Sequence, residues 1–139
     1  MTITNFENAD PSRGQAVRVL LVEDSVMIRD SLIDLIECNP QRAVAMATDS
    51  EVIAKAALAN QEYDIAIIDL ELNEGSGQGV LRFLLGRYRA PLRIVLTNSV
   101  EPRVREECLA LGADYFFNKS RQFDDVSQAI DRHLARPAL

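Results

Sequence analysis

The sequence predicts an open α/β sandwich, in which a five-stranded parallel sheet is flanked by five helices. Five short apolar segments rich in Val, Ile and Leu alternate with five segments whose apolar residues recur at helical spacing. The apolar segments show little alternation of apolar and polar residues, which is typical of strands that helices cover on both faces. Such alternation of strands with helices of about ten residues favours βαβ units joined by right-handed crossovers.

The first half of the chain contains three of the predicted strands. Residues 1–15 are polar and are interpreted as a flexible leader. The strand VRVLLV at 17–22 precedes a helix over 26–37, which Ser25 is placed to cap and Asn39-Pro40 to end. A weaker strand at 43–48 is followed by a helix to about Asn60, capped by Asp49 or Ser50. The third strand, YDIAIIDL, covers 63–70.

The second half repeats the pattern. A glycine-rich loop at 71–77 leads to a predicted helix over 79–88, and Pro91 precedes the strand LRIVL at 92–96. Pro102 suits the first turn of the next helix, which runs to Leu111 with Gly112 as its stop. A strand at 114–117 and a helix from Gln122 or Phe123 to Leu134 complete one predicted domain, residues 16–136.

Composition narrows the class of protein. A chain of 139 residues fits a single compact domain, and a net charge of −6 argues against direct binding of nucleic acid. The amino-terminal segment lacks the basic start and apolar core of a signal peptide, and no apolar run approaches the roughly 18 residues of a membrane span. We therefore expect a cytoplasmic protein without membrane contact. Cys38 and Cys108, which form no CxxC motif, are expected to be buried thiols.

Polar side chains follow four of the five predicted strands, at the carboxyl end of each. They are Glu23 and Asp24, then Asp69, then Thr97 with Asn98 and Ser99, and finally Asn118 with Lys119. Each alone has a simpler interpretation, as a strand end, a favourable charge at a helix start or a solvated side chain. In open parallel sheets, however, active groups lie beyond the carboxyl ends of the strands. The sequence therefore gathers these side chains at one edge.

The chemistry of such a cluster is constrained. Three neighbouring carboxylates repel one another, so a cation must share the site or protons must bind. Oxygen ligands favour a hard ion such as Mg²⁺, which keeps positions for water and phosphate oxygens. Lys119 and Thr97 can pair with a phosphoryl oxygen, and Asp69 can accept the phosphoryl group covalently. The residues thus favour phosphoryl transfer to Asp69.

Four segments in order resemble the receiver domains of bacterial two-component response regulators, whose fold is flavodoxin-like, (βα)5. The segments are VLLVEDSVMIRDSL, IAIIDLELNEGSGQGV, IVLTNS and GADYFFNKS. The resemblance implies that Asp69 is the phosphoacceptor and Lys119 its phosphate-pairing lysine. It implies that Asp24 ligates Mg²⁺ directly, Glu23 through water, and Glu71 through its backbone carbonyl. Thr97 matches the switch hydroxyl, and Phe116 matches the aromatic rotamer switch.

Three residues depart from the family's pattern. Asn73 and Ser120 stand where the family often has proline, and a cis peptide at Lys119–Ser120 would be costly without proline. Asn98 stands where a small residue usually follows the switch hydroxyl. We expect Asn98 and Glu71, which flank the site, to tune the lifetime of the phosphorylated state.

The resemblance also implies partners. A sensor histidine kinase or histidine phosphotransfer protein would dock near the first helix and phosphorylate Asp69. The surface of the fourth helix, fifth strand and fifth helix, residues 101–112 and 116–132, would then meet a downstream output protein. Arg103 and Arg105 give it some positive charge, unless they only solvate a helix face. A phosphorylation-dependent homodimer, a stand-alone regulator, a phosphorelay shuttle and a piece of a longer protein all stay open.

Other functions are weaker interpretations of the same residues. Asn73, Asn98 and Ser120 would suit a receiver-like interaction module that works without phosphorylation. Glu71, two residues after Asp69, would suit a small phosphohydrolase with an aspartate nucleophile. A nucleotide-binding flavodoxin-like protein is disfavoured because no glycine-rich loop follows the first strand. We expect a signalling switch rather than an enzyme acting on other substrates.

Overall fold

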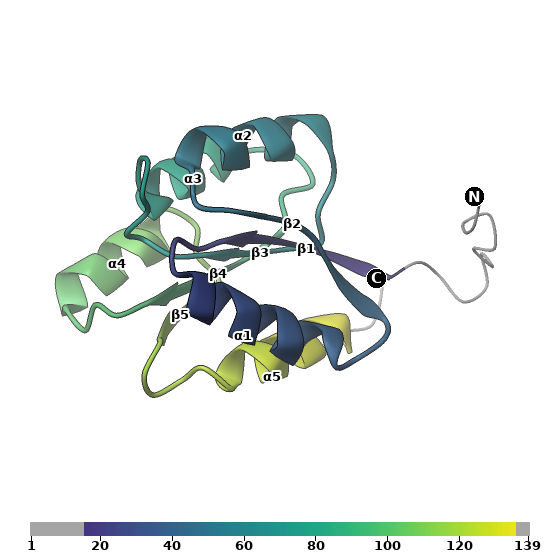
Figure 1. Cartoon of the computed structure of the whole chain (residues 1–139). Coiled ribbons are helices and arrows are strands. Elements are labelled where there is room, and N and C mark those ends of the chain that lie inside the picture. Colours follow the sequence, from purple (N-terminus) through teal and green to yellow (C-terminus); the bar gives the residue numbers. More distant parts are fainter. Residues whose placement is uncertain (1–15, 136–139) are drawn as a thin grey trace.

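A parallel five-stranded sheet forms the centre of the protein, with the strand order β2-β1-β3-β4-β5 (Figure 1). The computed structural model describes residues 16–135, so the predicted leader, 1–15, and residue 136 lie outside the described residues. The strands are β1 (Val17–Val22), β2 (Arg42–Thr48), β3 (Ile65–Ile68), β4 (Leu92–Thr97) and β5 (Tyr115–Asn118). All four strand pairings are parallel, which confirms the predicted fold class.

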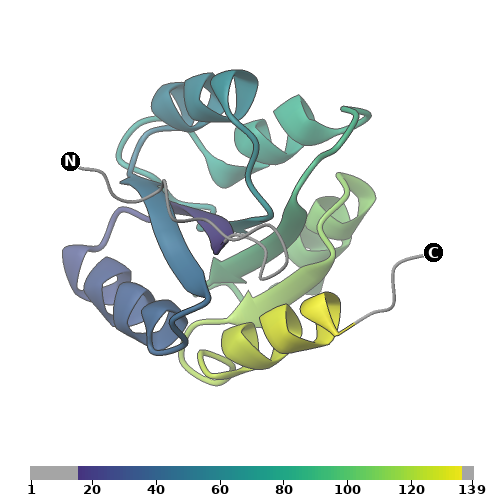
Figure 2. The ribbon, with the colours of Figure 1, turned by 90° about the vertical axis from the view of Figure 1, so that its right-hand side faces the viewer.

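Helices cover both faces of the sheet. One face carries α1 (Val26–Glu37) and α5 (Asp125–Leu134) (Figures 1 and 2). The other carries α2 (Glu51–Asn60), α3 (Gly77–Leu84) and α4 (Pro102–Ala110). None of the helices in the described part of the chain is long and apolar enough to cross a membrane.

Successive residues of each central strand enter opposite halves of the core. In β1, Val19 and Leu21 pack with α1 and α5, whereas Leu20 and Val22 pack with α2, α3 and α4. All four side chains are fully buried, and each contributes roughly 1.5–3 kcal/mol by leaving water. Because both faces are buried there, all four of these positions must be apolar, whereas the half-buried Arg18 lies at the start of the strand.

Three serines start helices by the same mechanism. The hydroxyls of Ser25, Ser50 and Ser76 accept hydrogen bonds from backbone N–H groups three residues later, at 3.3, 3.1 and 3.2 Å. The capping roles predicted for Ser25 and Ser50 are confirmed. Ser76 was not expected as a cap, and α3 consequently begins two residues before the predicted start at 79.

Several predicted boundaries are wrong by a few residues. Helix α3 ends at Leu84 rather than at residue 88, because Gly86 and Arg89 take positive φ values of 80° and 61° and turn the chain. Helix α5 starts at Asp125, because the preceding Gln122 closes a turn with its backbone N–H on the carbonyl of Asn118, at 2.8 Å.

The two thiols differ in burial. Cys108 in α4 is buried, as expected. Burial raises the pKa of its thiol to about 11, with a smaller contribution from the negative charge of Glu107. The prediction for Cys38 is wrong, because this residue caps the exposed carboxyl end of α1.

The strand order reverses between β1 and β3. From β1 the chain continues to β2 on one side, and then crosses to β3 on the other side of β1. In open α/β sheets such a switch point leaves a crevice beyond the carboxyl ends of its two strands. Glu23 and Asp24 follow β1, and Asp69 follows β3, so the topology places three carboxylates at this crevice.

Candidate functional site

Three carboxylates meet at the switch point. Glu23, Asp24 and Asp69 each offer one oxygen, and these atoms lie within 4.8 Å of one another. Glu23 and Asp69 retain only 1% and 3% of their exposure, and Asp24 is half-buried. We call these residues the acidic cluster. Its negative charge is concentrated where water is largely excluded.

Lys119 supplies a cation to the acidic cluster. Its Nζ atom lies 2.9 Å from Oε2 of Glu23 and 3.0 Å from Oδ2 of Asp69, and its side chain is 8% exposed. Lys119 follows β5, and β4 lies between β5 and β3, so the long side chain crosses the end of β4 to reach the carboxylates. The backbone N–H of Lys119 donates to the carbonyl of Thr97 at 2.8 Å, and this hydrogen bond fixes the backbone from which the side chain extends.

The pKa values of Glu23 and Lys119 are both raised, but for different reasons. Burial raises the pKa of Glu23 from 4.5 to about 7 against the opposing hydrogen bond from Lys119, and the charge of Asp69 raises it further. Burial acts to lower the pKa of Lys119, but its hydrogen bonds to Glu23 and Asp69 outweigh burial and leave the pKa raised. Lys119 is therefore a cation at neutral pH, beside a carboxyl group that can hold a proton there.

Short backbone contacts hold the carboxylates in place. The backbone N–H of Ser25 donates to Oε2 of Glu23 at 3.0 Å. The backbone N–H of Asp69 donates to the carbonyl of Val22 at 2.8 Å, and that of Glu71 approaches Oδ1 of Asp69 at 3.4 Å. Gly77 permits the start of α3 to close on this turn, since a Cβ there would meet Leu70 Cα at 2.9 Å.

A pocket of about 650 Å³ opens beside the acidic cluster, between the ends of β3 and β4. Its lining includes Glu71, Thr97 and Asn98, together with Gln78 of α3. Thr97 is buried, and its hydroxyl accepts a hydrogen bond from the backbone N–H of Ser99 at 3.2 Å. The structure thus brings three of the predicted site residues to one opening.

Phe116 lies in β5 rather than in this pocket. It is half-buried and packs against the half of the core that contains Val95 and Cys108. Its register partner in β4 is Val95, two residues before Thr97.

The three departures from the family pattern have partners of their own. The Asn73 side-chain amide donates to Oδ2 of Asp49 at 2.8 Å. The Ser120 hydroxyl donates to Oδ1 of Asn118 at 2.6 Å, and the described peptide bonds are all trans, including Lys119–Ser120. Asn98 is exposed, and its carbonyl accepts from the Asn118 amide at 3.5 Å.

Two further acidic residues were missed by reasoning from sequence. Glu51 and Glu74 join the amino end of α2 to the loop that follows Asp69, through hydrogen bonds of 2.6–3.2 Å. In sequence they resemble ordinary solvated acids. The signal that could have found them is the repeated glycine at 75, 77 and 79, because closely spaced glycines often mark a close approach of another chain segment.

The donor set of the acidic cluster suits Mg²⁺. The three residues offer only carboxylate oxygens, two of them buried, and their pairwise approach within 4.8 Å allows one small ion to contact all three. Burial is the main cause of the raised pKa of Glu23, and the charge of Asp69 adds to it; a bound cation would offset both by favouring the ionised carboxylate.

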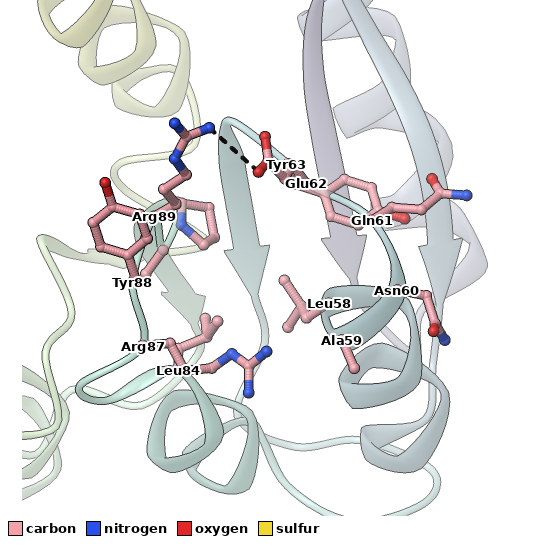
Figure 3. Close-up of a pocket in the computed structure, with 12 residues that line it drawn as sticks. Leu58, Ala59, Asn60, Gln61, Glu62, Tyr63, Leu84, Arg87, Tyr88 and Arg89 are labelled. Carbon is pink, nitrogen blue, oxygen red and sulfur yellow. Dashed lines mark ion pairs between the residues drawn. The ribbon is translucent and has the colours of Figure 1, made fainter.

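A second pocket, of about 320 Å³, lies at the opposite edge of the sheet. Arg87, Tyr88 and Arg89 approach it from the turn after α3, and Glu62 and Tyr63 from the segment before β3 (Figure 3). Exposed arginines and aromatic rings line it instead of buried carboxylates.

Comparison with known proteins defines the class to which this fold and site belong. The family described as "Response regulator receiver domain" matches residues 19–131, and the chain belongs to that family. Receiver domains are signalling modules of two-component systems that act as phosphorylation-dependent switches. The outer boundaries predicted for the domain, 16 and 136, stay predictions.

Individual relatives are longer than the segment that this chain matches. The chain is 26% identical over 114 residues to the DNA-binding transcriptional activator DevR/DosR of Mycobacterium tuberculosis. This alignment covers 82% of this chain and 52% of that protein. It is 31% identical over 125 residues to the protein-glutamate methylesterase/protein-glutamine glutaminase of Symbiobacterium thermophilum. This alignment covers 88% of this chain and 33% of that protein. The chain thus spans about half and about a third of the length of these two relatives.

A solved structure agrees with this class. A two-component response regulator of the LuxR family from Aurantimonas sp. SI85-9A1 superimposes with a TM-score of 0.78 at 25% identity, over 90% of each chain.

Proposed function

We propose that the chain is a signalling switch that accepts a phosphoryl group on Asp69 from a histidine kinase or a histidine phosphotransfer protein. One observation carries this proposal. A buried ammonium, Lys119 Nζ, lies 3.0 Å from Asp69 within a cluster of carboxylates, so the acceptor oxygen has a cation in place beside it. A carboxylate needs such a cation if an anionic phosphoryl group is to approach.

Glu23, Asp24 and Asp69, with the backbone carbonyl of Glu71, would hold Mg²⁺ at this edge. When bound, the ion would neutralise charge on the phosphoryl oxygens and orient them. The close approach of the three carboxylates supports this set. The Glu71 carbonyl is proposed from the resemblance, and the nearby N–H of Glu71 places this residue beside Asp69.

The transfer replaces one bond to phosphorus by another. An oxygen of Asp69 attacks the phosphorus in line, and the bond from phosphorus to the donor histidine nitrogen breaks, so the imidazole leaves with the electron pair. Lys119 remains beside the reacting carboxylate and pairs with a phosphoryl oxygen. Hydrolysis by water later returns Asp69 to its carboxylate form.

The phosphorylated state would be transmitted through β4 and β5. Thr97 lines the pocket beside Asp69, and its hydroxyl can turn from the Ser99 N–H to a phosphoryl oxygen. Phe116, on the neighbouring strand, would rotate into the space that Thr97 leaves. The surface of α4, β5 and α5, residues 101–112 and 116–132, would then bind an output protein or a second copy of the chain. On α4 this surface carries both signs of charge, since the exposed Arg103 and Arg105 lie beside exposed glutamates.

Mass spectrometry after incubation with acetyl phosphate and Mg²⁺ tests the acceptor. We expect wild type to gain one phosphoryl mass and Asp69→Asn to gain none, since the amide cannot form the acyl phosphate. Asp30→Asn, at an exposed position on α1, is the matched control and should behave as wild type. If acetyl phosphate, phosphoramidate and a phosphorylated histidine donor all fail with wild type, the chain is instead an interaction module that works without phosphorylation.

We further propose that Asn98 and Glu71 set the lifetime of the phosphorylated state, because both line the pocket that opens beside Leu70, the residue next to Asp69. Asn98→Ala should change the rate of dephosphorylation severalfold, measured as loss of the phosphoryl mass after the donor is removed. An unchanged rate would exclude a role for the Asn98 side chain.

A further inference from the structure

The loop that carries Glu71 is tied to the start of α2 by a carboxylate. Glu51, the first residue of α2, accepts a hydrogen bond from the backbone N–H of Ser76 on Oε1, at 2.9 Å. Its other oxygen, Oε2, accepts from Nζ of Lys55 at 3.0 Å. The contact with Ser76 joins residues 25 positions apart, so it is long-range structure rather than local turn chemistry.

Glu74 makes the reciprocal tie. Its Oε1 accepts from the hydroxyl of Ser50 at 2.6 Å and from the backbone N–H of Val52 at 3.2 Å. The Glu51 backbone N–H donates to the Glu74 carbonyl at 2.8 Å. We call Ser50, Glu51, Glu74 and Ser76 the clasp. The pKa values of Glu51 and Glu74 are both lowered, chiefly by the hydrogen bonds from Ser76 and Ser50, so the clasp has two ionised acceptors at neutral pH.

The clasp connects directly to the backbone of Glu71. Ser76 and Glu71 form an isolated antiparallel bridge, and the backbone N–H of Gly77 donates to the carbonyl of Leu70 at 3.0 Å. The path from α2 to the acceptor loop therefore runs from Glu51 through Ser76 to Glu71. The hydrogen bond from Asn73 to Asp49 ties the same two loops a second time, at a position where the family often has proline.

Gly79 shows that the neighbourhood is shaped to Glu51. A Cβ at Gly79 would overlap the carboxylate of Glu51, and no other side chain is among its nearest contacts. Gly79 lies within α3 and has no positive φ, so its backbone does not require glycine. Because glycine costs roughly 1 kcal/mol relative to alanine inside a helix, its presence here is explained by the space that Glu51 occupies.

We infer that Glu51 is a positioning residue, whose hydrogen bond to Ser76 fixes the backbone of Glu71 for the Mg²⁺ site beside Asp69. The inference rests on the proposed function for its metal, but the ordering of the loop is measurable without metal. Residues that orient a metal ligand typically change affinity by 10–100-fold when they are removed.

Two measurements on the full chain test the inference. In metal-free protein, Glu51→Ala should speed amide hydrogen exchange at Glu71 and Ser76, as read by NMR. In calorimetric titration with MgCl₂, the same variant should bind Mg²⁺ about tenfold more weakly. Glu51→Gln keeps an acceptor oxygen for Ser76 and should recover most of both effects. Lys55→Ala, which removes only the other partner of Glu51, should resemble wild type in both.

A double-variant cycle tests the packing. Gly79→Ala should displace the Glu51 carboxylate and weaken Mg²⁺ binding by a similar factor. In the Glu51→Ala background the added methyl meets no carboxylate, so Gly79→Ala should weaken binding no further. Additive losses would contradict the inference.

The failures of the two proposals are distinguishable. If Glu51→Ala speeds exchange at Ser76 but leaves Glu71 exchange and Mg²⁺ affinity unchanged, the clasp is structural only and the inference is wrong. If wild type binds no Mg²⁺, the metal part of the proposed function fails, and unchanged exchange at Glu71 would then overturn the positioning role as well.

Discussion

The carboxyl ends and the amino ends of the strands, here called the carboxyl edge and the amino edge of the sheet, both carry ion pairs, but these pairs differ in burial. At the carboxyl edge, Lys119 and Glu23 form an ion pair whose side chains are 8% and 1% exposed. At the amino edge, Arg89 and Glu62 form one at 3.5 Å whose side chains are 66% and 75% exposed (Figure 3). Water screens the second pair and leaves it worth at most about 1 kcal/mol, whereas the first pair cannot lose a partner without stranding a buried charge.

The comparison teaches where charge serves a function in this fold. Both edges lie beyond strand ends. The reversal of strand order between β1 and β3, however, opens a crevice only beyond the carboxyl ends of these strands. There, the buried apolar ends of β1 and β3 place carboxylates in a crevice from which water is largely excluded. At the amino edge, Arg87 stacks on Phe83 at 4.4 Å and Arg89 lies near the ring of Tyr88, which leaves both guanidinium groups in water.

The largest effect on stability should come from removing the buried cation. Lys119→Met leaves Glu23 and Asp69 without their shared partner, and should lower the free energy of unfolding by about 3 kcal/mol at pH 8 in EDTA. The loss should shrink at pH 6, where Glu23 can take up a proton. Urea unfolding followed by circular dichroism measures both values.

Lys55→Met is the matched control for this experiment. Lys55 pairs with Glu51 at the surface, so this variant should change stability by less than about 1 kcal/mol. Equal losses for the two lysine variants would contradict the contrast between the two kinds of pair.

The next effect should depend on pH. Because the folded chain holds a proton on Glu23 up to about pH 7 and the unfolded chain releases it near 4.5, this residue's contribution is complete below pH 4.5 and is lost as the pH rises through 7. Glu23→Gln removes the titration. In EDTA its unfolding free energy should therefore gain about 3 kcal/mol on wild type between pH 4.5 and 8.

Measuring the two proteins in urea across this pH range decides the matter. A constant difference would show that the pKa of Glu23 is the same in the folded and unfolded chain, which would contradict the raised value. Saturating Mg²⁺ should also flatten the wild-type dependence, because the ion and the proton compete for the same carboxylate.

The smallest effect should come from the amino edge. Arg89→Ala breaks the exposed pair with Glu62 and should change the unfolding free energy by less than about 1 kcal/mol, with no effect on phosphorylation. A larger loss in the same urea assay would mean that this edge contributes to stability in a way its exposure does not indicate.

The sequence predicted the fold because each of its signals is local. Ser25 and Ser50 cap helices through groups three residues away, and the apolar runs form strands wherever both faces are covered. It also predicted which side chains meet, since the carboxyl ends of parallel strands share one edge.

Features that depend on three-dimensional distance could not be predicted in the same way. The span of Lys119 across the end of β4, the clasp between Glu51 and Ser76, and the exposure of Cys38 all depend on how neighbouring loops pack. Helix α3 was misplaced for a related reason. Its cap, Ser76, lies among glycines that leave room for the Glu51 side chain, and this contact is not apparent from the sequence.

The scarcity of lysine in this chain has a practical consequence. Lys55 and Lys119 are the only two in 139 residues, and their side chains are 36% and 8% exposed. A reagent that acylates amines will therefore modify Lys55 readily, whereas Lys119 must leave its two carboxylates and lose a proton before it can react. The ratio of labelling at Lys119 to labelling at Lys55 therefore measures how often Lys119 separates from Glu23 and Asp69.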